Sequence, residues 1–385
     1  MNPVFAGLGT SIFAHMSGLA AEHDAVNLGQ GFPDFGWPED VLARAADAVV
    51  NGSNQYAPMR GLPVLREAVA AHYRRHQALD VTADQVTVTS GATEALAASL
   101  LSLIAPGDEV VLFQPLYDSY LPIVRAAGGM PRLVRLVPPG WRITEEALAA
   151  AFGERTRIVV FNNPHNPTSR LFDEEELRLL ADFCVRHDAV AVADEVWEHL
   201  VFDARRFVPV ASLPGMAERT VKIGSAGKIF SVTGWKVGWS VAPSPLAAAF
   251  AGAHQFLTFS TAPSLQSAVA FGLGKDQSYY DGMRAAFARA RDGFVRDLAT
   301  AGFTALPAEA TYFVSIDLQA SGIAADDVAF CERAVRECGV AGIPVSAFYA
   351  EDPVTDVVRL CFAKREETLA AGLRGLERAR TLFAA

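Results

Sequence analysis

The chain has 385 residues, 51% of them hydrophobic and 20% charged, and its formal net charge is −10. This length exceeds what one hydrophobic core usually serves, so it predicts two domains. The acidic balance argues against nucleic acid and anionic membranes as partners, because both attract basic patches. No apolar stretch is long enough to span a bilayer and the first residues lack a signal-peptide pattern, so we expect a cytoplasmic protein.

The cysteines point to the same compartment. None of the four forms a CxxC pair, and no Cys/His cluster has the spacing of a zinc site. We therefore expect no metal and four reduced thiols, at Cys184, Cys331, Cys338 and Cys361.

The first forty residues are rich in Gly, Pro and Phe, with a turn-forming run from Leu28 to Phe35. This composition predicts an extended, turning segment rather than a helix. Regular patterns begin at Pro63–Gln77, where apolar residues follow helical spacing and a proline is placed to open the helix. The β-branched stretch Gln85–Thr89 predicts a strand, and Ala92–Ile104 predicts a helix.

Strands and helices continue to alternate as far as residue 242. Helices are predicted at Glu145–Phe152 and Asp173–Arg186. Strands are predicted at Glu109–Phe113, Arg132–Val137, Arg157–Phe161, Ala189–Ala193, Thr220–Ile223 and Val237–Ala242. Several of these strands are continuous apolar runs, which is typical of strands buried on both faces. The predicted fold is α/β, a large domain with a mostly parallel sheet flanked by helices, plus a smaller α+β domain.

A long helix predicted from Ser278 to Ala301 separates the α/β region from the shorter elements that follow. We expect the large domain to span residues 45–278 and the C-terminal small domain to span residues 279–385. Residues 1–44 are expected to join the small domain.

Polar side chains follow several predicted strands, where an open α/β sheet binds its ligands. The first group, Ser90–Glu94, opens a predicted helix, and its glycine allows close approach of a ligand to the backbone. The N-terminus of a helix attracts anions, so a phosphate site is one interpretation. The other is an ordinary strand-to-helix turn with Thr93 as a cap.

The second group, Asn162–Thr168, has the sequence NNPHNPT. Its two prolines restrict the backbone and would fix the orientation of Asn166. A rigid amide can donate to a ligand oxygen, although a proline turn with solvent-facing asparagines explains the pattern as well.

The third group follows the most apolar strand, where Asp194 comes directly after a run of Ala and Val. A carboxylate there is costly to bury unless a cation pairs with it. The partner could be a protonated pyridine nitrogen, or equally an Arg or Lys of the protein.

The fourth group is SAGK, ending at Lys228, followed by TGWKVGW with Lys236. Small residues around a single lysine leave room for a bulky ligand. Such a lysine could form a Schiff base if burial or nearby charge lowers its pKa. A surface lysine in a glycine loop is the weaker interpretation.

Nine segments in this order resemble fold-type-I aminotransferases of class I/II, which depend on pyridoxal 5'-phosphate (PLP). They are NLGQGFPDF, NQYAP, SGATEA, PLYDSY, NPHNPT, ADEVWEHL, SAGKIFSVTGWKVGW, HQFLTFS and RLCFAK, and they cover nearly the whole chain. The likeness is to bacterial methionine/glutamine/kynurenine-type and N-succinyldiaminopimelate aminotransferases. It implies a PLP transferase type I fold.

The resemblance implies roles for individual residues. Lys228 would hold the cofactor and carry the Cα proton, Asp194 would pair with the pyridinium nitrogen, and Asn166 would donate to the phenolate oxygen. Arg359 would hold the substrate carboxylate, and Gly31 would lie over the substrate. The remaining cofactor contacts would come from Ala92, Thr93, Ser225 and Lys236 at the phosphate and from Tyr117 stacked on the ring.

The resemblance also implies a homodimer, because Tyr56 would reach the phosphate of the partner subunit. The segment Phe256–Ser260 would lie near the neighbouring site, although core packing explains its aromatic residues equally well.

One residue departs from the family. Trp197 stands where a tyrosine usually donates to the phenolate oxygen, and an indole N–H has a different size and position. Our hypothesis is that the imine formed by Lys228 is less stabilised in its deprotonated form, so its pKa rises. The departure also affects which reaction is favoured.

The expected activity is amino transfer from an L-amino acid to a 2-oxo acid. The expected donor is large and neutral, sulfur-containing or aromatic, because the resemblance implies that Phe13, Phe32, Trp37, Tyr117 and Phe348 surround a roomy apolar pocket. A PLP lyase or decarboxylase, an N-succinyldiaminopimelate-type aminotransferase, and a non-catalytic binding protein are the alternatives.

Overall fold

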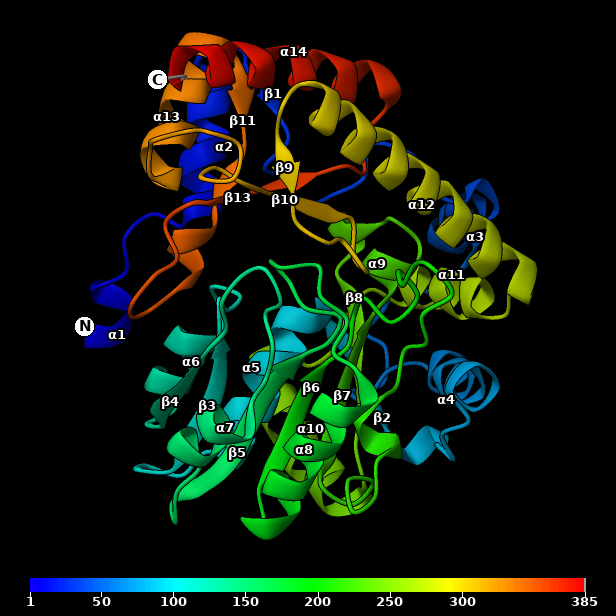
Figure 1. Cartoon of the computed structure of the whole chain (residues 1–385). Coiled ribbons are helices and arrows are strands. Elements are labelled where there is room, and N and C mark those ends of the chain that lie inside the picture. The colour runs from blue at the N-terminus through cyan, green and yellow to red at the C-terminus, as the bar shows by residue number, and fades with distance from the viewer. Residues whose placement is uncertain (384–385) are drawn as a thin grey trace.

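A seven-stranded sheet forms the centre of the computed structural model, which describes residues 1–383 (Figure 1). The strand order is β2-β8-β7-β6-β5-β3-β4. Only β8 runs antiparallel to its neighbours, so the expected mostly parallel sheet is confirmed. The strands are β2 (Val86–Ser90), β3 (Glu109–Gln114), β4 (Met130–Arg135), β5 (Thr156–Asn162), β6 (Val190–Asp194), β7 (Thr220–Ser225) and β8 (Val237–Val241).

Both faces of this sheet are buried. Successive side chains of a strand point to opposite sides, and here both sets of side chains belong to a hydrophobic core. In β5, Ile158 and Val160 belong to one hydrophobic core, whereas Val159 and Phe161 belong to another. The continuous apolar runs of the sequence are therefore explained by two cores on one sheet.

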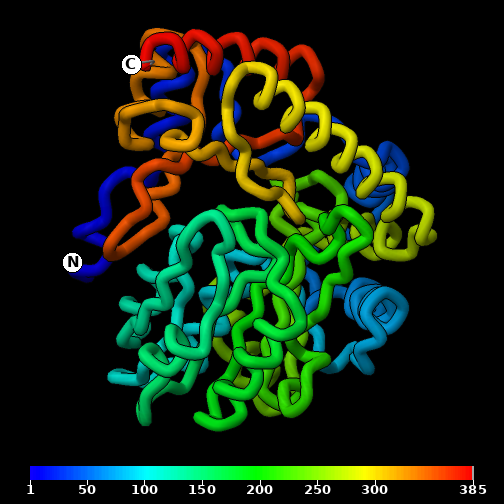
Figure 2. Tube along the Cα trace, viewed as in Figure 1, coloured from blue at the N-terminus to red at the C-terminus, as the bar shows by residue number. Residues whose placement is uncertain are grey.

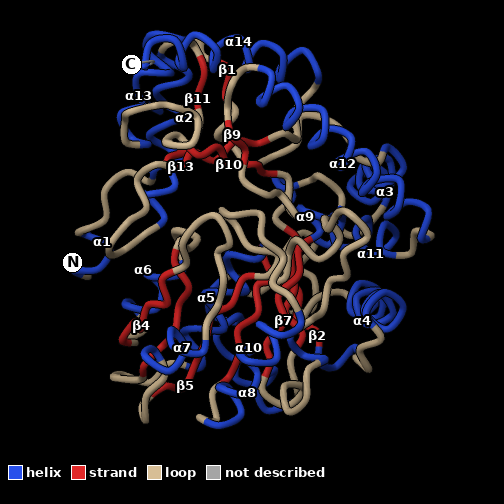
Figure 3. Tube along the Cα trace, viewed as in Figure 1, coloured by secondary structure: helices blue, strands red, loops and turns tan. Residues whose placement is uncertain are grey.

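Helices cover both faces, as Figure 3 shows. On one side α5 (Gly91–Leu103) contacts β6, β7 and β8 and packs against α10 (Ser244–Leu257). On the other, α8 (Glu174–Arg186) contributes Leu177 and Leu180 to the second core. The remaining α-helices between residues 39 and 300 are α3 (Glu39–Asn51), α4 (Pro63–Gln77), α6 (Tyr120–Ala126), α7 (Glu145–Ala151), α9 (Ala226–Ile229), α11 (Pro263–Leu273) and α12 (Gln277–Thr300).

Segments from both parts of the sequence lie side by side in a second region, where blue and orange to red stretches of the chain meet in Figure 2. There β1 (Val26–Asn27) pairs in parallel with β11 (Val340–Ala341). A four-stranded sheet has the order β12-β13-β10-β9. Its strands are β9 (Thr304–Ala305), β10 (Phe313–Asp317), β12 (Ile343–Pro344) and β13 (Val357–Cys361), and the helices there are α13 (Asp327–Cys338) and α14 (Glu366–Phe383). Domain boundaries at residues 44 and 278 stay a prediction.

The expectation of a non-helical N-terminal segment was wrong. α1 (Pro3–Ala6) and α2 (Ile12–Glu22) are both helical. The hydroxyl of Ser11 caps α2 by accepting from the Ala14 N–H at 3.2 Å, and Met16, Leu19 and Ala20 share its buried face. This helical spacing outweighs the Gly and Pro content of the surrounding sequence.

Within the described residues, no helix has both the length and the apolar character needed to cross a membrane.

Candidate active site

A cavity of about 240 Å³ opens where β5, β6 and β7 end, at Asn162, Asp194 and Ser225. The cavity therefore lies at the carboxyl ends of the parallel strands, where open α/β sheets bind their ligands. Its lining comprises Gly91, Ala92, Thr93, Leu96, Tyr117, Tyr120, Asn162, Asn166, Asp194, Val196, Trp197, Ser225, Gly227, Lys228, Thr233 and Lys236.

One end of the cavity is suited to an anion. Gly91 opens α5 with φ of +77°, a backbone conformation that glycine adopts without strain. A Cβ on Gly91 would lie 3.3 Å from Nζ of Lys236. The N–H groups of Ala92 and Thr93 belong to the first turn of α5, where they lack partners within the helix and carry its partial positive charge. The Ser225 hydroxyl accepts from the Gly227 N–H at 3.2 Å, which leaves its own proton free to donate.

Asp194 supplies a buried carboxylate to the cavity lining. Its Oδ2 accepts a hydrogen bond of 2.6 Å from the Tyr120 hydroxyl. Its Oδ1 is buried and has no hydrogen-bond partner among residues 1–383. Burial raises the pKa of Asp194 above its ordinary value, and the bond from Tyr120 opposes that shift. A buried oxygen without a partner costs free energy, so this site is built for a donor that comes with a ligand.

Lys228 lies on α9, where its amine faces two aromatic residues. Nζ is 3.0 Å from the Tyr312 hydroxyl oxygen and 4.5 Å from the centre of the Trp197 ring. Burial lowers the pKa of Lys228 to about 8, and the carboxylate of Asp194 opposes this shift. Near neutral pH a fraction of this amine is unprotonated and can act as a nucleophile or a base.

Arg359 and Asn166 form a polar pair beside Lys228. Nη1 of Arg359 donates to Oδ1 of Asn166 at 2.8 Å, which turns the Asn166 amide nitrogen away from the arginine. Nη2 donates to the Gly29 carbonyl at 3.0 Å. Arg359 is 1% exposed, and its Nε has no partner among the described residues. Burial lowers the pKa of Arg359 to about 10.

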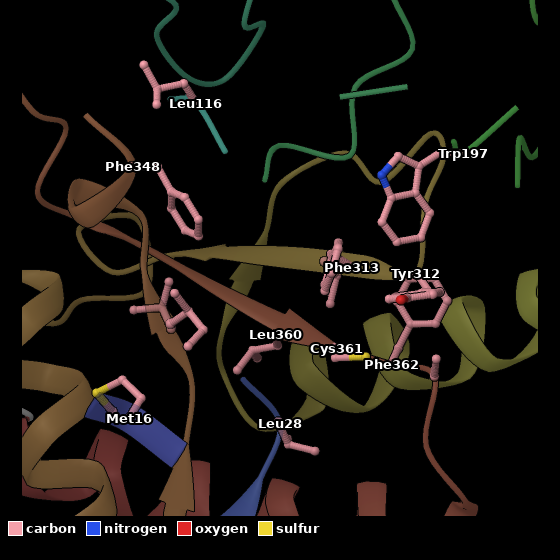
Figure 4. Close-up of a cluster of buried hydrophobic side chains, with 14 of the residues drawn as sticks. Met16, Leu28, Leu116, Trp197, Tyr312, Phe313, Phe348, Leu360, Cys361 and Phe362 are labelled. Atoms are coloured by element: carbon pink, nitrogen blue, oxygen red, sulfur yellow. The ribbon is translucent and has the colours of Figure 1, made fainter. Parts of the chain in front are cut away.

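Aromatic rings surround this guanidinium. Its central carbon lies 3.9 Å from the Phe313 ring centre, 5.2 Å from that of Phe13 and 5.3 Å from that of Phe348. The rings of Phe13 and Phe348 are 5.6 Å apart, and Phe13 is 6.5 Å from Tyr117. In the view of Figure 4, Phe313 lies between Phe348 and the pair formed by Trp197 and Tyr312. The arginine therefore combines a positive charge with an apolar wall.

The structure brings most of the predicted site residues to one place. The cavity is lined by Ala92, Thr93, Tyr117, Asn166, Asp194, Ser225, Lys228 and Lys236. Arg359 contacts Asn166, and the Gly31 carbonyl contacts Tyr312, which reaches Lys228.

Other predicted residues lie apart. Tyr56 is 87% exposed and its ring contacts Phe259, 5.8 Å away between centres. Phe32 lies under Nζ of Lys364 at 4.3 Å, and Trp37 is exposed. The sequence had suggested that Phe32 and Trp37 line the pocket with Phe13, but the shared ring contacts involve Phe13, Tyr117 and Phe348.

Three further residues that contact the predicted site residues were not singled out from the sequence. The Tyr120 hydroxyl donates to the Asp194 carboxylate. The Asn162 amide nitrogen donates to the Asp194 backbone carbonyl at 2.8 Å, and the Asn162 amide oxygen accepts from the Asn166 N–H, also at 2.8 Å. Both stand in or beside quoted motifs, so their position was a usable signal. Tyr312 precedes β10, more than eighty residues after Lys228, and no local pattern marks it.

Comparisons with known proteins agree over nearly the whole chain. The family model "Aminotransferase class I and II" matches residues 23–376. The chain is 42% identical to methionine aminotransferase of Escherichia coli (strain K12), covering 96% of each protein. It is 36% identical to kynurenine–oxoglutarate transaminase 1 of Homo sapiens, covering 92% of each. The solved N-succinyldiaminopimelate aminotransferase of Mycobacterium tuberculosis superposes with a TM-score of 0.95 at 41% identity, over 98% of this chain and 100% of that one.

Proposed function

Because this chain belongs to the class I and II aminotransferases, PLP-dependent enzymes that transfer an amino group to a 2-oxo acid, we propose that the cavity around Lys228 is its active site. We further propose that Arg359 anchors the α-carboxylate of both substrates. A large neutral, sulfur-containing or aromatic L-amino acid is the proposed donor.

The residues present fit PLP at its pyridine nitrogen, its phosphate and its phenolate oxygen. A pyridinium N–H would satisfy the partnerless Oδ1 of Asp194, and a carboxylate paired with it would keep the ring nitrogen protonated. The N-terminus of α5, with Lys236 and Ser225, would hold the phosphate. The amide nitrogen of Asn166 is free to donate to the phenolate oxygen, because its oxygen is already occupied by Arg359.

One observation carries the proposal for the substrate: Arg359 is a fully buried cation with no carboxylate of the described chain in ion-pair contact. An unpaired buried charge is costly and normally attracts an opposite charge. Arginine has five N–H groups, and among residues 1–383 only two acceptors are bonded, one by Nη1 and one by Nη2. The remaining donors suit the two oxygens of a carboxylate.

The chain's own residues divide the chemistry between them. Bound PLP supplies an electron sink that makes the α-proton of the amino acid acidic. Nζ of Lys228, with its pKa of about 8, removes this proton from Cα and returns it on the cofactor side. Arg359 fixes the carboxylate during that transfer, and Asp194 keeps the negative charge opposite the ring nitrogen. Trp197 and Tyr312 exclude water from one side of Lys228.

The apolar wall supports the proposed donor class. Phe13, Phe348 and Tyr117 form the ring contacts next to Arg359, so the side chain of a bound amino acid would meet aromatic carbon. Asp118 is half-buried nearby, and burial raises the pKa of its carboxyl while Arg359 lowers it. A carboxylate in this position disfavours an acidic side chain, which argues against an N-succinyldiaminopimelate-type donor.

We also propose a cytoplasmic homodimer. The anion-binding end of the cavity is open in the single chain, because Thr93 and Lys236 are exposed. Tyr56 and Phe256 are 87% and 86% exposed, and such aromatic exposure is typical of a surface that a second copy covers. Tyr56 would then reach the partner's phosphate. The four buried cysteines are free thiols, which suits a reducing compartment.

A paired-substrate assay tests the function. PLP-loaded protein is offered methionine, phenylalanine, glutamate and N-succinyl-diaminopimelate, each with and without a 2-oxo acid acceptor. We expect product only with an acceptor, and the highest kcat/KM for methionine or phenylalanine. Product formed without an acceptor would point to a lyase or decarboxylase, and a preference for the succinylated donor would overturn the proposed substrate class.

A further inference from the structure

Tyr312 is a buried residue that links three parts of the site. It stands just before β10, and its ring contacts those of Trp197 at 4.5 Å and Phe313 at 4.9 Å between centres. Figure 4 shows the indole of Trp197 and the ring of Tyr312 one above the other. Its hydroxyl lies 3.0 Å from Nζ of Lys228 and 2.5 Å from the Gly31 carbonyl oxygen.

The direction of these two hydrogen bonds follows from counting protons. A phenol has one proton to donate, and a carbonyl oxygen can only accept. The Tyr312 proton therefore goes to Gly31, and the phenol oxygen must accept from an N–H of Lys228. Burial raises the pKa of Tyr312 well above 10, so the proton stays on the phenol and Tyr312 is not itself the base.

We propose that Tyr312 is a positioning residue for amino transfer: by accepting from Lys228 it leaves the amine lone pair free for the substrate Cα proton. The proposal rests on the assigned role of Lys228 as the proton carrier. A neutral amine has two N–H groups and one lone pair. Fixing one N–H on Tyr312 restricts the rotation of the amine, and the indole face of Trp197 limits it on another side.

The hydrogen bond between Tyr312 and Lys228 also couples the state of the Lys228 amine to the position of the N-terminal segment around Gly29 and Gly31. Gly29 and Gly31 are both held by their carbonyls, Gly29 on Arg359 and Gly31 on Tyr312. If the Gly31 carbonyl moves away, the Tyr312 proton is released and can turn to the lone pair of Lys228. Tyr312 then blocks the base instead of freeing it. The N-terminal segment thus prepares Lys228 only when it lies over the substrate.

The pKa of Lys228 reports which direction the bond takes. An oxygen that accepts from Lys228 stabilises the ammonium form, and one that donates to it stabilises the amine. The other titratable groups that act on this amine are Asp194, Cys361, Arg359 and Lys236. A Tyr312→Phe substitution removes only the oxygen and leaves these four in place. Removing an acceptor lowers the pKa of Lys228, and removing a donor raises it.

The test is a titration of Lys228 in the holoenzyme with its cofactor in the amine form, in which Lys228 is free. The chain has only five lysines, so ¹³Cε-lysine NMR can follow each one, and Lys228→Ala assigns the signal. In Tyr312→Phe we expect the Lys228 pKa to fall by about one unit. We expect kcat to fall about 10- to 100-fold with KM changed less than about 3-fold, and the Cα-deuterium isotope effect to rise.

Two further variants make the result specific. Tyr349 also donates its hydroxyl to a backbone carbonyl, that of Leu136 at 2.7 Å, so Tyr349→Phe controls for the loss of such a bond and should change none of these values. Gly31→Ala would place Cβ 2.7 Å from the Phe313 ring and force the segment to shift. It should lower the Lys228 pKa in the parent protein but not in the Tyr312→Phe background.

A rise in the Lys228 pKa in Tyr312→Phe, or an unchanged pKa, kcat and isotope effect, overturns the proposal. A failure of the underlying function is distinguishable, because Lys228→Ala would then still turn over at the parent rate.

Discussion

Replacing Arg359 with lysine tests the substrate anchor directly. The guanidinium donates to Asn166 and Gly29 and stacks 3.9 Å from the Phe313 ring centre. An ammonium group keeps the charge but presents a point donor instead of a planar fork, so it cannot bind two carboxylate oxygens and the two protein oxygens together. At least one charge-assisted bond to the substrate is lost.

The expected size of the effect follows from that loss. A hydrogen bond to a charged group contributes about 1.5 to 3 kcal/mol. At about 1.4 kcal/mol for each factor of ten, kcat/KM for an amino acid should fall roughly 10- to 150-fold. Because the carboxylate is bound before and during the proton transfer, most of the loss should be in KM.

The assay is steady-state kinetics with methionine and an oxo acid, alongside absorbance of the bound cofactor. The absorbance shows that the cofactor is still bound, which separates a loss at the substrate end of the cavity from a loss of the cofactor. Arg291→Lys is the matched control, since Arg291 is also buried but makes a two-pronged ion pair with Asp203, at 2.6 and 2.7 Å, outside the cavity. A fall in kcat/KM of less than about 3-fold in Arg359→Lys, or an equal fall in Arg291→Lys, would refute the assignment.

Three other outcomes are expected. Trp197→Tyr should lower the pKa of the imine formed by Lys228, followed as cofactor absorbance against pH, and an unchanged pKa would contradict the role given to the indole. Phe348→Ala should lower kcat/KM for phenylalanine about 10-fold more than for alanine, because a larger cavity loses contact with a large side chain only; an equal loss for both donors would refute the apolar wall. Burial and neighbouring positive charges lower the pKa of His72 and His199 well below 6.5, and their Nε2 atoms are 2.8 Å apart. Below pH 6.5 both histidines become protonated in the unfolded chain but stay neutral in the folded protein. The free energy of unfolding should therefore decrease as the pH falls below 6.5, by up to about 1.4 kcal/mol per pH unit for each histidine. Urea unfolding from pH 7.5 to 5 measures this slope, and a slope unchanged in His72→Gln would exclude the pair as its cause.

The large sheet was predictable because its signals are local. Continuous apolar runs mark strands buried on both faces, and the helix Pro63–Gln77 has the same bounds in the structure as in the prediction. Strand ends differ by one or two residues, as at β4, where the structure begins at Met130 rather than Arg132. End residues depend on pairing with neighbouring strands, which a single sequence does not reveal.

The site was predictable to the extent that its residues sit in motifs. Lys228, Asp194 and Asn166 each follow a strand of one sheet, so the fold alone brings them together. Arg359 comes from a different sheet, and only the resemblance singled it out. The place of Tyr312 in the site could not be predicted from the sequence, because it depends on a hydroxyl that reaches from the second region to Lys228 and Gly31.

The charges in the cavity describe the ligand's polarity without reference to any relative. Lys236 and the N-terminus of α5 are positive, Asp194 is negative, and Arg359 is positive. Asp194 has an oxygen and Arg359 a nitrogen without a hydrogen-bond partner within the described chain. A ligand that satisfies all three must carry two negative groups and one positive group. A phosphate, an α-carboxylate and a protonated ring nitrogen supply them when PLP and an amino acid are bound together, whereas PLP alone leaves Arg359 unsatisfied. Substrate binding is therefore expected to stabilise the protein beyond the cofactor, and a non-reactive carboxylate such as a 2-methyl amino acid should raise the melting temperature of the holoenzyme but not that of its Arg359→Lys variant.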